Sequence, residues 1–165
     1  MRRNPSAVSY FRNFIFGVED SLVSTVGLLS GIAIAHIPRE TIFLTGLILI
    51  FVEAFSMAAG TFLSEYSAEE YARGAEHSAK GNFVSGAVMF FSYFVSGFVP
   101  LVPYAVWPVK TALVFSILFS VIALFTLGII GAKMSGTHFV KNGLRMAAIG
   151  SAAIIVGLVA GILLR

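Results

Sequence analysis

Three acidic side chains lie inside apolar stretches of this sequence, where an ionised group is costly. Glu19 and Asp20 are about two turns into the first long apolar run, and Glu53 lies near the middle of the second. A charge at membrane depth costs from about 3 to more than 10 kcal/mol, and no structural role requires that cost. These carboxyl groups are therefore candidate functional residues, able to bind a cation and to exchange it for protons.

The residue one helical turn after Glu53 indicates which cations suit this chemistry. That residue is Met57, whose thioether prefers softer ions than a carboxylate does. A metal set of Asp20, Glu53 and Met57 therefore favours Fe(II), Co(II) or Mn(II) over Ca(II) and Mg(II). Packing remains an equal alternative for Met57, because methionine is common in apolar helices. For Glu19 and Asp20 the alternative is a shallow position at the membrane interface, near Arg12.

The composition of the whole chain requires lipid as the solvent for these residues. Of 165 residues, 58% are hydrophobic and only 12% are charged, about half the charged share of a soluble domain. In lipid only helices or closed barrels satisfy the backbone, and the apolar runs are too unbroken for barrel strands. The predicted fold class is all-α integral membrane. The net charge of +3 is explained by topology, so we expect no nucleic-acid partner, and the absence of cysteine excludes thiolate chemistry.

Five apolar stretches of about 20 residues can each cross a hydrocarbon core of roughly 30 Å. The predicted spans form one transmembrane domain, residues 1–165, and they run over residues 14–37, 41–63, 83–106, 111–132 and 144–164. A short polar connector, residues 64–82, separates the second and third. Prolines agree with these limits: Pro38 is expected to close the first span, and Pro100, Pro103 and Pro108 cluster around the end of the third.

The distribution of Lys and Arg predicts the orientation of the chain. Eight of these residues share one side (Arg2, Arg3, Arg12, Arg73, Lys80, Lys133, Lys141 and Arg145), and three share the other (Arg39, Lys110 and Arg165). The positive-inside rule then places the N-terminus in the cytoplasm and the C-terminus outside. The first run could instead be a signal peptide, but Glu19 and Asp20 argue against it. A prokaryotic plasma membrane is the expected location, with a vacuolar membrane as the eukaryotic alternative.

Small and acidic residues form further patterns on the predicted helices. Asp20, Ser24, Gly27 and Gly31 share one face, and the two glycines form a G-x-x-x-G pair suited to helix packing or a dimer contact. Four glycines share a face of the fifth span: Gly143, Gly150, Gly157 and Gly161. The connector carries a possible cytoplasmic metal-collecting set: Glu65, Glu69, Glu70 and Glu76. The alternative for this segment is a solvated helical extension of the second span.

Several strings along the chain, taken in order, resemble the vacuolar iron transporter family. Residues 12–25 (RNFIFGVEDSLVST) are similar to its first helix and residues 53–60 (EAFSMAAG) to its second, while residues 100–104, 128–133 and 143–150 are similar to its later helices. The resemblance implies a five-helix homodimer that moves Fe(II), and often Mn(II), out of the cytosol in exchange for protons. It implies no enzymatic activity and no permanently bound cofactor. It makes Asp20 the translocation carboxylate and Met57 a ligand, with Glu53 beside it.

The chain departs from the family pattern at three places. Glu19 and Ser21 replace the small polar residue and the glycine usual around the first-helix aspartate, and Thr61 replaces a glutamate common in the second helix. The connector is also much shorter than the glutamate-rich domain of many members. A non-transporting membrane scaffold that packs through its glycine faces is the main functional alternative. An intramembrane hydrolase ranks lower, because no nucleophile or metalloprotease motif is present.

Overall fold

The computed structural model describes residues 5–74 and 79–163, and within these ranges every regular element is an α-helix. The five helices are α1 (Pro5–Ile34), α2 (Arg39–Arg73), α3 (Lys80–Val106), α4 (Val109–Ser135) and α5 (Phe139–Leu163). Each is long and apolar enough to cross a membrane. The predicted class, an all-α integral membrane protein with five spans, is confirmed.

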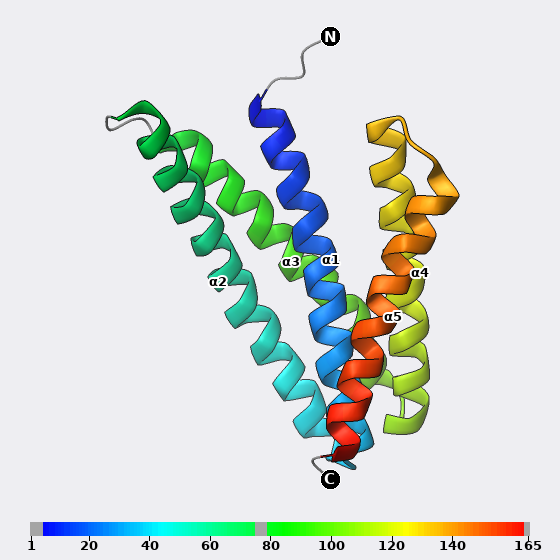
Figure 1. The fold of residues 1–165 in the computed structure, drawn as a ribbon. Coiled ribbons are helices and arrows are strands. Elements are labelled where there is room, and N and C mark those ends of the chain that lie inside the picture. The colour runs from blue at the N-terminus through cyan, green and yellow to red at the C-terminus, as the bar shows by residue number, and fades with distance from the viewer. Residues whose placement is uncertain (1–4, 75–78, 164–165) are drawn as a thin grey trace.

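Helix α1 is the central element of the bundle and contacts all four of the others. The start of α1 and the α2–α3 and α4–α5 connections lie at one end of the molecule, which we call the N-terminal end (Figure 1). The α1–α2 and α3–α4 connections lie at the opposite end. Helix α2 packs mainly on α3 and leans away from α1 toward the N-terminal end (Figure 1). Helices α1 and α2 therefore diverge along their length.

The end of α2 differs from the predicted span, and the end of α3 agrees with it. Helix α2 continues to Arg73, so the first half of the predicted polar connector is helical, as the alternative interpretation held. Helix α3 ends at Val106, the predicted limit, and Pro100 and Pro103 lie inside its last turns without ending it. Membrane helices tolerate proline where neighbouring helices satisfy the backbone, and here the Ser116 hydroxyl of α4 donates to the Pro100 carbonyl at 2.7 Å.

The connection between α1 and α2 is short and strained. Helix α1 ends at Ile34, before the predicted limit at residue 37, and Pro38 directly precedes α2. Between them His36 has a φ of 62°, in the left-handed region, where a residue other than glycine loses about 1–2 kcal/mol. The chain thus reverses direction within a few residues and keeps these ends of α1 and α2 close together.

Helices α1 and α5 pack through glycine at the end opposite the N-terminus. A Cβ atom added at Gly31 would lie 2.7 Å from the Gly157 carbonyl oxygen, and one added at Gly27 would lie 3.4 Å from the Ala153 carbonyl oxygen. Cβ atoms on Gly157 or Gly161 would overlap the backbone of α1. Only small residues permit this approach, which explains the G-x-x-x-G pair. In this chain the pair packs within one copy, against α5.

Candidate metal site

The structure brings together two of the predicted metal ligands, Asp20 and Glu53. Asp20 lies midway along α1, and Glu53 lies near the middle of α2. Both side chains are half-buried, and their carboxyl groups are close enough to interact electrostatically. Two acidic groups therefore lie within electrostatic reach of each other, each near the middle of a helix long and apolar enough to cross a membrane.

Met57 lies one turn beyond Glu53 on the same side of α2 and is also partly exposed. Its sulfur is therefore available to a species that contacts Glu53. In the described residues, 5–74 and 79–163, no group of three or more His, Cys, Asp or Glu side chains is close enough to hold a metal ion. Within one copy, the predicted metal ligands are therefore two carboxylates and one thioether.

Tyr93 of α3 belongs to this site and was not singled out from the sequence. Its side chain is fully buried, and its hydroxyl lies 2.7 Å from the Ser24 hydroxyl, one turn after Asp20. The Tyr93 hydroxyl is also within electrostatic reach of both Asp20 and Glu53. A second bond, from the Ser21 hydroxyl to the Tyr93 carbonyl oxygen at 2.6 Å, fixes α1 against α3 at this level. Tyr93 thus holds the turn of α1 that presents Asp20.

Glu19 faces a different part of the bundle from Asp20, although the two residues are adjacent. It lines a cavity of about 320 Å³ between α1, α4 and α5. Arg145 of α5 lines the same cavity and is close enough to interact electrostatically with Glu19. The charged neighbour of Glu19 is therefore basic and lies on α5, whereas the charged neighbour of Asp20 is acidic and lies on α2.

The four glutamates of the predicted metal-collecting set do not share one environment. Glu65 is mostly buried, with 16% of its side chain exposed, and one of its carboxylate oxygens accepts hydrogen bonds from α1. Glu69 is partly buried and lines, with Glu65, a polar pocket of about 420 Å³. Glu70 is exposed, and Glu76 lies outside the described residues. Glu65 and Glu69 thus share a pocket, whereas Glu70 is exposed to solvent.

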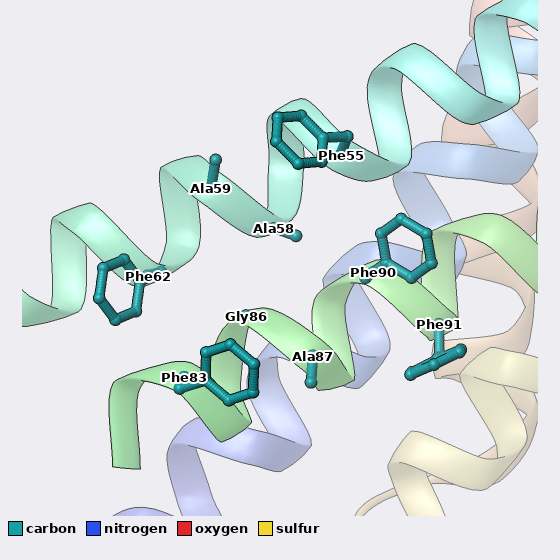
Figure 2. Close-up of a pocket in the computed structure, with 9 residues that line it drawn as sticks. All are labelled: Phe55, Ala58, Ala59, Phe62, Phe83, Gly86, Ala87, Phe90 and Phe91. Atoms are coloured by element: carbon teal, nitrogen blue, oxygen red, sulfur yellow. The ribbon is translucent and has the colours of Figure 1, made fainter. Parts of the chain in front are cut away.

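An apolar cavity of about 430 Å³ between α2 and α3 has a different chemistry (Figure 2). It is lined by phenylalanine, alanine and glycine residues: Phe55, Ala58, Ala59, Phe62, Phe83, Gly86, Ala87, Phe90 and Phe91. Phe55 and Phe62 follow Glu53 by two and nine residues, which places them on the opposite side of α2 from Glu53. The side chains that line this cavity offer no oxygen, nitrogen or sulfur ligand to a cation.

Five helices of membrane-spanning length, with opposed carboxyl groups midway along two of them, define a polytopic membrane protein with an ionisable interior. The sequence model of the VIT family matches residues 11–83 and 72–162, and so covers most of the chain. The chain therefore belongs to the VIT family, the vacuolar iron transporters, whose function is the transport of metal ions across membranes. A search of curated proteins returned no match.

Proposed function

We propose that this chain transports Fe(II) or Mn(II) out of the cytoplasm in exchange for protons. The observation that carries the proposal is that the two acidic side chains Asp20 of α1 and Glu53 of α2 lie within electrostatic reach of each other. With the Met57 thioether nearby, the ligand set combines hard and soft donors, which suits borderline divalent ions. Asp20, Glu53 and Met57 act as ligands in this function, and we propose no enzymatic step.

Proton exchange follows from the chemistry of two facing carboxyl groups. Two carboxylates in one site repel each other and are difficult to ionise together, unless a cation lies between them. Binding of a divalent ion to Asp20 and Glu53 therefore releases protons, and reprotonation helps to release the ion. A cycle of this kind exchanges metal for protons without any permanently bound cofactor.

The orientation in this proposal comes from the charge distribution of the sequence, and the homodimer comes from the family resemblance. The excess of basic residues places the N-terminal end in the cytoplasm, in a prokaryotic plasma membrane or, in a eukaryote, a vacuolar membrane. One copy supplies Asp20, Glu53 and Met57 to an ion, and a homodimer would let a second copy complete the coordination shell. The only other partners proposed are lipid, the metal ion and protons.

Flux measurements in proteoliposomes test this function. We expect Asp20→Asn, Glu53→Gln and Met57→Leu each to lower Fe(II) flux by about tenfold or more, because each removes one ligand atom while nearly conserving volume. Glu40→Gln is the matched control for Glu53→Gln, since the Glu40 side chain is 79% exposed. Met134→Leu is the control for the methionine, since Met134 lies near the end of α4.

Two results would overturn the proposal. Fe(II) flux that is unchanged in both Asp20→Asn and Met57→Leu would remove the assigned site. Fe(II) flux that does not respond to a pH gradient, with the internal pH read by a trapped dye, would remove the exchange of metal for protons. Repeating the assay with Mn(II) as a competitor determines which of the two ions the site prefers.

A further inference from the structure

A polar cluster joins α1 to α2 at the N-terminal end of the molecule, well away from the carboxyl pair. Its centre is the Oε1 atom of Glu65 on α2. This atom accepts hydrogen bonds from the side chains of Ser9, Arg12 and Asn13, at 2.9 Å for the last two. The Arg12 contact is also an ion pair. We call these four residues the Glu65 cluster.

On α1, the Glu65 cluster lies on the same face as Asp20, which Asn13 precedes by two turns. On α2, Glu65 follows Glu53 by twelve residues, about 18 Å along the helix and about 120° around it, toward α3. The cluster is therefore the next set of polar contacts along this face of α1 on the way from Asp20 to the N-terminal end. A cation that approaches Asp20 from that end along α1 meets the cluster first.

The contacts of the cluster make it a barrier to a cation while they are formed. Its hydrogen bonds join α1 to α2 at the end where the two helices diverge (Figure 1), and the Arg12 guanidinium adds a positive charge at the same place. The cluster can also open. The Arg12 side chain is 68% exposed, so water can replace its bond to Glu65. The contacts of α2 with α1 in this cluster are made by side chains, which can rearrange.

We propose that the Glu65 cluster is a gate between α1 and α2 that must open before an ion from the N-terminal side reaches Asp20 and Glu53. The inference rests on the proposed transport function and adds to it a step of regulated access. In the closed state Glu65 is a positioning residue that holds α1 against α2, and it is not a ligand of the transported ion. Alternating access to a site at mid-depth needs a barrier of this kind on each side.

A reversible cross-link tests whether the gate has to open for transport. The chain contains no cysteine, so Ser9→Cys with Glu65→Cys introduces the only two thiols. A short bis-methanethiosulfonate reagent then ties α1 to α2. We expect Fe(II) flux to fall by about tenfold or more on cross-linking and to recover when dithiothreitol cleaves the link. Each single-cysteine variant, treated identically, should have the same flux before and after the reagent. Equal flux with and without the intact cross-link overturns the gate.

A distance measurement separates failure of the gate from failure of the transport function. Spin labels on Val8→Cys and Tyr71→Cys, both at exposed positions, report the α1–α2 separation by pulsed electron paramagnetic resonance, with labelled chain diluted in unlabelled chain. Glu65→Ala should lengthen and broaden that distance, whereas Glu70→Ala, at an exposed position on the same helix, should not. If the parent moves no Fe(II), the proposed function fails. An unchanged distance in Glu65→Ala overturns the gate by itself.

Discussion

Helix α1 is held in two different ways on the sides that face α5 and α2. Toward α5, Gly27 and Gly31 let the two backbones touch, and no side chain lies between them. Toward α2, polar side chains bridge a wider separation, as in the hydrogen bond from Arg12 to Glu65 at 2.9 Å. A shift of either helix opens the close backbone contact between glycines, whereas exposed side-chain bonds can exchange with water. The difference indicates that α1 and α5 form a fixed unit and that α2 is the adjustable neighbour.

The largest expected effect comes from disturbing the glycine contact. Gly157→Ala places a methyl group in overlap with the Gly27 carbonyl, and only a backbone shift relieves it. We expect a loss of about 3 kcal/mol in the free energy of unfolding, measured by reversible unfolding in mixed micelles. Gly60→Ala on α2 is the matched control, since its Cβ would meet no atom within 4 Å. Equal stability of the two variants would contradict the idea of a fixed α1–α5 unit.

An intermediate effect is expected between α1 and α3, which are joined by buried side-chain hydrogen bonds. Ser21→Ala removes the hydrogen bond to the Tyr93 carbonyl oxygen, and the expected cost is about 1 kcal/mol in the same unfolding assay. Thr126→Ala serves as the control, because the Thr126 hydroxyl bonds within α4 at an exposed position. If Ser21→Ala matched Gly157→Ala in cost, polar contacts would hold α1 as firmly as glycine contacts do.

The smallest effect on stability is expected on the α2 side. Arg12→Gln removes the ion pair with Glu65, but Arg12 is largely exposed, so the free energy of unfolding should fall by no more than about 0.5 kcal/mol. Arg39→Gln, which removes the exposed pair with Glu40, is the control and should change stability as little. A loss of several kcal/mol in Arg12→Gln would place α2 in the fixed unit and remove the contrast.

The fold was largely predictable because membrane spans depend on local composition. Five long apolar runs were enough for the number of helices and their order. Sequence alone was less informative about how each helix ends. Pro100 and Pro103 lie near the end of α3, as expected, but the Ser116 hydroxyl of α4 satisfies a carbonyl there and the helix continues through both prolines. The extension of α2 to Arg73 was left open because a polar helix and a polar loop have similar compositions.

The candidate site was predictable only where a residue type was unusual for its surroundings. Asp20 and Glu53 stood out as acids in apolar runs, and the structure places them together. Tyr93 did not stand out, because tyrosine is unremarkable in an apolar helix and its partner Ser24 is 69 residues away in sequence. The role of Glu65 was hidden for the same reason: its donors come from a helix more than 50 residues earlier. Pairing between distant helices is a tertiary property.

The short turn around His36 gives α1 and α2 the geometry of a lever. The two helices are joined closely at this turn, and α1 is 30 residues, or about 45 Å, long. A rotation of only about 5° about the turn would move the far end of α2 relative to α1 by about 4 Å, but would separate them by only about half as much midway along. Such a displacement breaks a hydrogen bond at Glu65 while Asp20 and Glu53 remain neighbours. Small angular changes at one end of the bundle can thus be amplified at the other without dismantling its middle.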